Sequence, residues 1–413
     1  MNVKLLQRSD RWVGIPLCFI LTAFRTIFAR TAPDCSRPPR SLLVVKLAEQ
    51  GSTVLAYQAL RRAGEIVGPE NVYFIAFEDN RFILDILNVI PEQNVVTVSV
   101  KSLSAFLGSM ISAIRRLRRL KLDAAVDMEF FSRGSAALAF LSGAKRRVGF
   151  HAFFSAGPYR GDLMTHRLLY NPHLHTSQSF LMLVEAILAN PAILPTLNLF
   201  PTPATVEPPQ FAPGDDEVAR VKELLRHETG GHPPLILLNA NSSDLIPLRR
   251  WPAERHVELA RRLLEKYPEM FVAFVGAPDE APATTELVRR VASTRCVSLA
   301  GRTTLRELLV LYTLAELLVT NDSGPAHFAT LTPIHVVTLF GPETPELFAA
   351  RTPRNTVLWA NLLCSPCVNA YNNRQSPCRN NLCMQSITVD QTLAAAGRVY
   401  EQRMQSKGVS SAS

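Results

Sequence analysis

Residues 317–345 read LLVTNDSGPAHFATLTPIHVVTLFGPETP. The apolar run at 317–320 predicts a buried strand, and the run at 335–340 predicts a second one. Between them, turn-forming Asn321 and Asp322 lead into Pro325, a residue favoured in the first turn of a helix. The stretch therefore predicts strand, loop, helix and strand, which is the repeating unit of a parallel α/β sheet.

The same alternation of strands and amphipathic helices occurs in two series along the chain. The expected strands are residues 41–47, 71–77, 94–98, 124–128 and 147–150, and then 235–239, 271–275, 297–299, 317–320 and 335–340. Closely spaced prolines between Pro191 and Pro213 separate the two series, because proline interrupts regular elements. We therefore expect an α/β protein of two Rossmann-like domains facing a central cleft, with ligands at the carboxyl ends of the strands.

The expected domain boundaries follow from these series. Residues 1–40 form an apolar and basic segment with a linker, and residues 41–205 form the first Rossmann-like domain. Residues 206–232 are expected to be a linker. Residues 233–386 form the second Rossmann-like domain with a cysteine-containing loop, and residues 387–413 form a terminal helix and tail.

Composition narrows the class of protein. The 413 residues include 44 Lys and Arg against 35 Asp and Glu, a net charge of +9. A mean hydropathy of +0.09 excludes an intrinsically disordered chain, and the absence of a glycine period or sustained heptad excludes collagen and coiled coil. The basic excess favours an anionic partner: nucleic acid, an anionic membrane or a nucleotide substrate.

The N-terminal segment combines an apolar run with basic flanks. Residues 12–24 read WVGIPLCFILTAF, and the basic residues around them are Lys4, Arg8, Arg11, Arg25, Arg30, Arg37 and Arg40. The run is shorter than the ~20 residues that span a bilayer, which favours a helix lying in an anionic leaflet. A helix packed on the domain and a signal peptide are the alternatives.

The loop at 321–327 can bind a phosphate. Free amides at the predicted helix N-terminus, together with Ser323 and Gly324, provide hydrogen-bond donors for an anion. His327, one turn further on, is expected to face the same site. Alternatively, Asp322 and Ser323 only cap the helix.

Three stretches together resemble glycosyltransferase family 9, the heptosyltransferase-like family. They are NDSGPAHFAT with the following FGPETP, LLNANSSDLIPLRRWPAERHVELARRL at 237–263, and LLVVKLAEQGSTVLAYQALRRA at 42–63. The resemblance implies a GT-B fold and metal-independent, inverting transfer of a sugar from a nucleotide-diphosphate donor. It also implies that the second domain binds the donor and that the first presents the acceptor.

The resemblance assigns the donor-binding residues. Asp322, Ser323, Gly324 and His327 match the motif for diphosphate and sugar. Arg249 stands where the family usually has a phosphate-binding Lys, and Ser242 and Ser243 are candidate hydroxyl donors to phosphate. Glu280, after the strand at 271–275, is a candidate for a ribose hydroxyl, with helix capping as the alternative.

The first domain departs from the family at the position of the general base. The family has Gly-Asp, whereas this chain has Gly51-Ser52. A serine cannot accept a proton near neutral pH without a base beside it. We therefore predict Glu49 as the substitute base, with Ser52 and Gly51 in the same loop. The alternatives are a base elsewhere in the chain or a protein that has lost transferase activity. Lys46, at the end of the first strand, is expected to hold the acceptor or stabilise the leaving diphosphate.

Four cysteines lie close together in the sequence at Cys364, Cys367, Cys378 and Cys383. Four thiols in such a segment suit a structural zinc site. The alternative is that they are paired or free structural cysteines. No other cofactor or metal is expected.

The sequence thus predicts a glycosyltransferase that moves heptose or a related sugar to a lipopolysaccharide-core or other cell-envelope glycolipid. The expected partners are a nucleotide sugar, a lipid-linked saccharide acceptor and the anionic cytoplasmic face of the inner membrane, and not nucleic acid. Because Ser52 replaces the family's Asp, a catalytically silent nucleotide-sugar-binding or scaffold protein stays possible. A nucleotide-sugar epimerase with the same fold is the other alternative.

Overall fold

The computed structural model describes residues 9–28, 34–153, 157–193, 207–242 and 246–410. The chain divides into two compact units. Unit 1 comprises residues 1–207 with Val368–Gln375, and unit 2 comprises Pro208–Cys367 with residues 376–413. The two units are described separately below.

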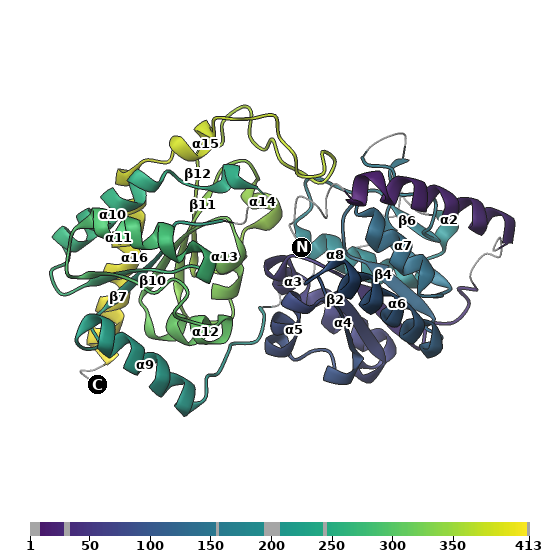
Figure 1. Cartoon of the computed structure of the whole chain (residues 1–413), viewed down its shortest axis with the longest axis horizontal. Coiled ribbons are helices and arrows are strands. Elements are labelled where there is room, and N and C mark those ends of the chain that lie inside the picture. Colours follow the sequence, from purple (N-terminus) through teal and green to yellow (C-terminus); the bar gives the residue numbers. More distant parts are fainter. Residues whose placement is uncertain (1–8, 29–33, 154–156, 194–206, 243–245, 411–413) are drawn as a thin grey trace. The chain divides into compact units, whose positions relative to one another are not determined.

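Unit 1 contains a parallel sheet with helices on both faces (Figure 1). Its strand order is β3-β2-β1-β4-β5-β6, the doubly wound order of a Rossmann fold. The strands are β1 (Leu42–Val45), β2 (Val72–Phe77), β3 (Val95–Val98), β4 (Ala124–Asp127), β5 (Arg146–Phe150) and β6 (His166–Leu168). The helices are α2 (Gly14–Phe28), α3 (Gln50–Leu55), α4 (Tyr57–Val67), α5 (Arg81–Leu87), α6 (Leu103–Leu120), α7 (Arg133–Leu141) and α8 (Thr176–Glu185).

The continuous apolar sequence of β1 is explained by burial on both sides. Leu42 and Val44 belong to one hydrophobic cluster, whereas Leu43 and Val45 belong to another. The first cluster includes residues of α4 and α8, and the second includes residues of α2, α6 and α7. A strand covered on both faces must be apolar at every position.

Unit 2 repeats this architecture with the order β12-β11-β10-β7-β8-β9, again entirely parallel. Its strands are β7 (Leu235–Asn239), β8 (Phe271–Phe274), β9 (Cys296–Ser298), β10 (Leu317–Asn321), β11 (His335–Phe340) and β12 (Asn355–Trp359). Its helices are α9 (Asp215–Thr229), α10 (Ala253–Lys266), α11 (Ala281–Val291), α12 (Leu305–Leu314), α13 (Gly324–Ala329), α14 (Pro345–Phe348), α15 (Leu382–Gln385) and α16 (Val389–Ser410).

The predicted α/β class with two Rossmann-like sheets is confirmed, and three details differ from the prediction. The expected linker at 206–232 contains the helix α9, because Val221 and Leu225 supply a buried apolar stripe. Strands β6 and β12 were not predicted, since each is a short edge strand with polar residues. The third difference is that Val368–Gln375, expected within the second domain, belongs to unit 1.

The N-terminal helix packs along α7 through one face (Figure 1). Gly14 allows this close approach, because a Cβ atom there would lie 2.7 Å from the Cβ of Arg133. The Asp10 carboxylate accepts hydrogen bonds from the backbone amides of Arg133 and Gly134, both at 2.9 Å. These amides begin α7, so Asp10 caps that helix and fixes the N-terminal segment to unit 1.

Candidate functional site

In unit 2, three charged residues lie in loops that follow three neighbouring strands. Arg249 follows β7, Asp322 follows β10, and Glu343 follows β11. These strands are adjacent in the sheet, so their carboxyl ends converge at one edge. The guanidinium of Arg249 pairs with Asp322, Nε to Oδ2 at 3.4 Å, and its Nη2 pairs with Glu343. The structure therefore brings together two predicted residues and one, Glu343, that the sequence reading missed.

The three charged side chains of this cluster are largely buried, so each charge needs a partner of opposite sign. The side chains of Glu343 and Asp322 are almost fully buried, and Arg249 is 16% exposed. Burial raises the pKa of Asp322, and the Arg249 guanidinium opposes that shift. The cation thus stabilises two carboxylates that would otherwise be buried without a partner.

The turn that carries Arg249 is fixed by neighbouring polar groups. The backbone amide of Trp251 donates to the side-chain oxygen of Asn321 at 3.0 Å, and the indole donates to the Ile387 carbonyl at 2.9 Å. The side-chain amide of Asn381 donates to the backbone carbonyls of Leu248 and Arg250. Asn321 therefore holds the Arg249 turn, a role that the sequence reading did not assign to it.

The other predicted donor residues are placed as follows. His327 and Ser323 are buried, and the Ser323 hydroxyl donates to the Asn321 carbonyl instead of capping a helix. Gly324 begins α13, which is only six residues long. The buried Ser242 hydroxyl has no hydrogen-bond partner among the described residues, and Ser243 lies outside them.

The side chain of Glu280 is hydrogen-bonded to the backbone of its own loop. Its carboxylate accepts from the Ala277 amide at 2.7 Å, forming the capping interaction that was the alternative to ribose binding. Burial raises the pKa of Glu280, and the Ala277 amide opposes this. The ribose contact stays a prediction.

In unit 1, the predicted catalytic residues gather at the carboxyl end of β1. Glu49 has a left-handed backbone, with φ 67°, and precedes α3. The Ser52 hydroxyl lies within hydrogen-bond distance of both the Glu49 backbone carbonyl, at 3.0 Å, and Glu49 Oε2, at 3.2 Å. Gly51 and Ser52 are buried in α3. The structure thus places a carboxylate beside the serine, and a left-handed non-glycine residue is a form of strain found at functional sites.

Lys46 is part of a buried network below this loop. Its ammonium donates to the Ala48 carbonyl at 2.9 Å and lies 3.8 Å from Glu129. Glu129 also accepts from the Leu47 and Ala48 amides. Burial lowers the pKa of Lys46, and Glu129 opposes this. These contacts make Lys46 a support for the loop that carries Glu49.

A second buried ion pair lies at the end of the neighbouring strand β4. Asp127 pairs with Arg160 and accepts from the Ser135 hydroxyl at 2.9 Å. Burial raises the pKa of Asp127 to about 6, and Arg160 opposes the shift. The sequence reading missed Asp127, Arg160 and Glu129, although an acidic residue at the end of a predicted buried strand was the available signal.

The cysteine cluster is the candidate for a structural zinc site. Within the described ranges, no three His, Cys, Asp or Glu side chains are arranged to hold a metal ion. Cys364, Cys367, Cys378 and Cys383 form no disulfide among the described residues. Burial raises the pKa of Cys383, and Cys367, Cys364 and Cys378 raise it further, so the four thiols lie near one another. A structural zinc site stays a prediction.

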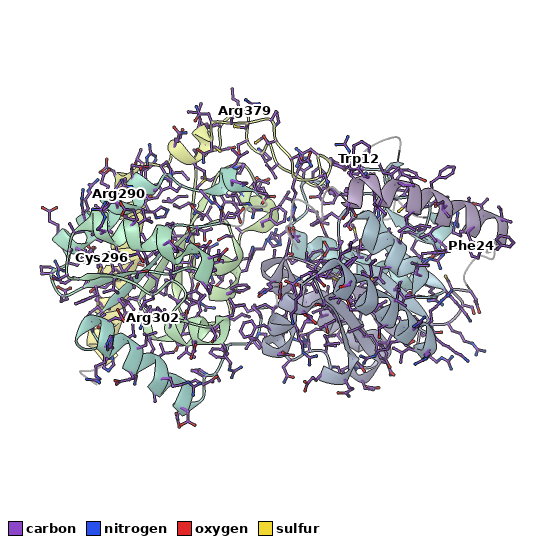
Figure 2. The ribbon with its side chains drawn as sticks, in the orientation of Figure 1. Trp12, Phe24, Arg290, Cys296, Arg302 and Arg379 are labelled. Atoms are coloured by element: carbon purple, nitrogen blue, oxygen red, sulfur yellow. The ribbon has the colours of Figure 1, made fainter. Side chains whose placement is uncertain are left out.

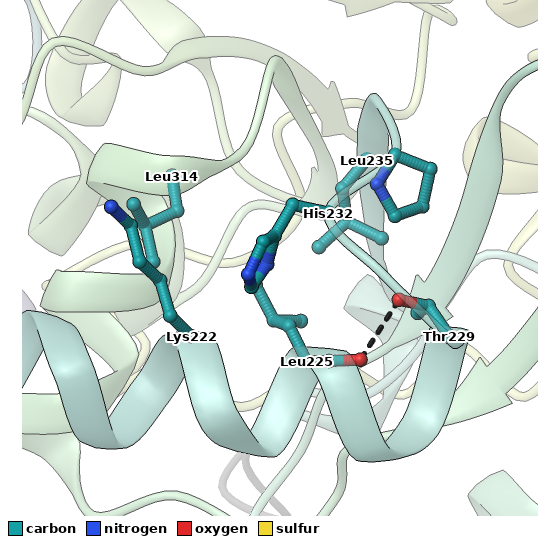
Figure 3. A pocket seen from close by; sticks show the side chains of 7 residues that line it. Lys222, Leu225, Thr229, His232, Leu235 and Leu314 are labelled. Atoms are coloured by element: carbon teal, nitrogen blue, oxygen red, sulfur yellow. Dashed lines mark hydrogen bonds between the residues drawn. The ribbon is translucent and has the colours of Figure 1, made fainter.

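A pocket elsewhere in unit 2 contains none of the predicted site residues. It lies between α9 and the end of α12, where Lys222, His232 and Leu314 line it (Figure 3). Within it, the Thr229 hydroxyl donates to the Leu225 carbonyl at 2.8 Å, which satisfies the end of α9. We assign no role to this pocket.

Comparison with known proteins identifies the family. Residues 110–376 match the model of glycosyltransferase family 9 (heptosyltransferase). The chain belongs to glycosyltransferase family 9. The predicted resemblance is confirmed, and the match includes Arg249, Asp322 and Glu343 of the unit 2 cluster.

Curated family 9 relatives match parts of the chain. Lipopolysaccharide heptosyltransferase 2 of Escherichia coli K12 is 26% identical over 218 residues, 51% of this chain and 58% of the relative. The enzyme of the same name from Salmonella typhimurium is 32% identical over 103 residues, 24% of this chain and 29% of the relative. The chain thus spans 58% and 29% of the length of these two relatives.

Solved family 9 structures are similar over most of the chain. The E. coli ADP-heptose lipopolysaccharide heptosyltransferase II has a TM-score of 0.63 and 18% identity, covering 88% of this chain and 99% of that one. A family 9 structure from Veillonella parvula has a TM-score of 0.67 and 18% identity, covering 88% and 97%. At this identity the likeness shows the fold, and the predicted GT-B class is confirmed.

Proposed function

We propose that this protein is an inverting glycosyltransferase that moves heptose or a related sugar from a nucleotide-diphosphate donor to a lipopolysaccharide-core or other cell-envelope glycolipid. One observation carries the proposal: Arg249, held by Asp322 and Glu343 at the edge of the unit 2 sheet, lies in the part of the chain that matches family 9. Relatives named lipopolysaccharide heptosyltransferase 2 support the choice of sugar and acceptor.

Each residue of the unit 2 cluster has a proposed task in this reaction. The carboxylates of Asp322 and Glu343 engage Nε and Nη2 of Arg249 and so orient the guanidinium, which stabilises the diphosphate as it leaves. The Glu343 Oε1 atom is buried without a hydrogen-bond partner in the described structure. An unsatisfied buried acceptor costs about 1–3 kcal/mol, so a sugar hydroxyl that donates to it would be stabilised.

In unit 1, Glu49 is the proposed general base. It takes the proton of the acceptor hydroxyl while the hydroxyl oxygen forms a bond to the anomeric carbon. The bond from that carbon to the diphosphate breaks on the opposite face, and the diphosphate leaves with the electron pair. Ser52 stands at the position of the family's aspartate. In this chain the Ser52 hydroxyl and the Glu49 carboxylate together take the place of that aspartate.

The decisive experiment is turnover by the full chain. ADP-, GDP- and UDP-sugars, with ADP-heptose as the first arm, would be incubated with dispersed cell-envelope glycolipid, and nucleoside diphosphate and glycolipid mass would be measured. Release that depends on the lipid, with a matching gain in mass, is expected. Tight donor binding without release for every acceptor would favour the silent binding protein instead.

We also propose that the N-terminal helix lies in the cytoplasmic leaflet of the inner membrane. The helix Ser9–Phe28 is long and apolar enough to cross a bilayer. However, Cys18 is buried against unit 1, Thr22 accepts from the Asp162 amide, and Arg25 pairs with Asp162. A helix fixed along one face to a folded unit is better placed to lie along a membrane surface than to cross it.

The opposite face of this helix supplies the apolar contact. Its exposed apolar side chains, of which Figure 2 labels Trp12 and Phe24, are Trp12, Phe19, Ile20, Phe24, Ile27 and Phe28. Helix α6, which packs on the same face of the sheet, exposes Leu103, Leu107 and Ile111 at four-residue spacing, followed by arginines. Apolar and basic side chains together suit an anionic lipid surface.

Replacing Phe19 and Phe24 together by serine is expected to weaken binding to vesicles of phosphatidylethanolamine and phosphatidylglycerol by at least about 100-fold. Burying each phenylalanine in the interface contributes about 1.5–3 kcal/mol. Vesicle sedimentation measures the change. Leu363→Ser, at a fully exposed apolar site in unit 2, is the control. Unchanged binding by the double variant would contradict the membrane proposal.

A further inference from the structure

The segment Val368–Gln375 belongs to unit 1, although the residues on both sides of it belong to unit 2. The two ends of this segment are held together within unit 2. The Ser376 hydroxyl donates to the Cys367 sulfur at 3.3 Å, and the Cys367 amide donates to the Pro342 carbonyl at 3.0 Å. A late part of the chain is thereby delivered to the unit that contains Glu49.

The segment is anchored in unit 1 by an aromatic contact. The ring of Tyr371 lies 5.2 Å from that of Tyr170 and 5.8 Å from that of Phe131, and its hydroxyl donates to the Tyr170 carbonyl. Ala370 is buried in the unit 1 hydrophobic core. The glycine at 157 makes room, because a Cβ there would lie 3.3 Å from the Tyr371 ring.

The loop is built to present Arg374. Asn369 and Asn372 each accept the other's backbone amide at 3.1 Å, and the Arg374 amide donates to the Asn369 carbonyl at 2.9 Å. Asn373 and Arg374 both have left-handed backbones, with φ of 53° and 56°. Such conformations cost free energy in non-glycine residues, and here the surrounding hydrogen bonds hold them.

The presented guanidinium pairs with Glu49 Oε1. It lies 5.7 Å from the Phe130 ring, and its side chain is 14% exposed. Burial lowers the pKa of Arg374 to about 10, so it stays a cation at neutral pH. The two carboxylate oxygens of Glu49 thus have different partners. Oε1 pairs with Arg374, and Oε2 lies beside the Ser52 hydroxyl.

We infer that Arg374 is the positioning residue of the general base: it holds Glu49 Oε1 so that Oε2 is directed at the acceptor hydroxyl. This inference rests on the proposed transferase function. It adds to that function a residue from the cysteine-containing loop, more than 300 residues after the base it orients. The arginine acts through Glu49 and needs no contact with the substrate.

The test is a double-variant cycle on the full chain. Arg374→Gln is expected to lower kcat by about 10- to 100-fold, because a small displacement of a catalytic group costs that much, while the donor KM changes little. Arg374→Lys should recover part of the loss, since it keeps the charge but loses the fork geometry. In a Glu49→Gln background, Arg374→Gln should have almost no further effect on kcat, because the group it orients is gone.

The controls separate this inference from the proposed function and from a general structural role. Arg379→Ala changes an exposed arginine of the same loop, labelled in Figure 2, and should leave kcat unchanged. An equal loss from Arg374→Gln in both backgrounds would mean that the arginine only supports the fold, and would overturn the inference. If the wild type transfers sugar and Arg374→Gln transfers it equally fast, the positioning role of Arg374 is overturned and the proposed function stands. No transfer by the wild type overturns the proposed function together with the positioning role.

Discussion

Replacing Arg249 by alanine is expected to lower kcat/KM for the nucleotide-sugar donor by about 10²- to 10³-fold. This is the size of the loss when one preorganised electrostatic donor is removed from a transition-state site. Arg249 is the cation of the unit 2 cluster, and its loss also leaves Asp322 and Glu343 buried without a positive partner. The free energy of unfolding should therefore fall by about 3–5 kcal/mol.

Steady-state kinetics and denaturant unfolding measure these two effects. Arg249→Lys keeps the charge and should recover much of the stability but only part of the activity, since lysine cannot engage two carboxylates as a fork. Arg290→Ala serves as the matched control. Arg290, labelled in Figure 2, is a surface arginine that pairs with Glu254. This variant should change stability by less than about 0.5 kcal/mol. Full donor turnover by Arg249→Ala would remove this residue from the leaving-group site.

Glu49→Gln is expected to lower kcat by about 10²- to 10⁴-fold, the range that a positioned general base contributes. The amide keeps the shape of the side chain but cannot accept the proton, so donor binding in unit 2 should be unchanged. Single-turnover kinetics with titration calorimetry of the donor separate the two effects. Glu65→Gln, on the exposed face of α4, is the control.

A rescue variant makes this second prediction sharper. The family carries an aspartate where this chain has Ser52, and the Ser52 hydroxyl lies 3.2 Å from Glu49 Oε2. In the Glu49→Gln background, Ser52→Asp should therefore restore part of the lost kcat by placing a carboxylate in the same loop. Full activity of Glu49→Gln would exclude Glu49 as the base, and failure of the rescue would show that position 52 no longer faces the acceptor.

The sequence alone predicted the α/β class and the central strands of both sheets. Continuous apolar runs such as that of β1 predicted strands buried on both faces, since each position of the run contributes to one of two cores. The loop after β10 and the arginine after β7 were identified from the sequence because turn-forming residues and the family motif occupy short, continuous stretches of it. Edge strands β6 and β12 were missed because half-polar strands have no comparable local pattern.

Only the tertiary structure decided how the charged residues are paired. Glu343 looks like a solvated loop residue in the sequence, yet it is buried against Arg249, 94 residues away. Arg374 lies in a polar loop that predicts nothing about Glu49, and the fold brings the two together within unit 1. Hydrophobic periodicity reports which face of an element is buried, whereas the partner of a buried charge depends on where distant loops meet at a sheet edge.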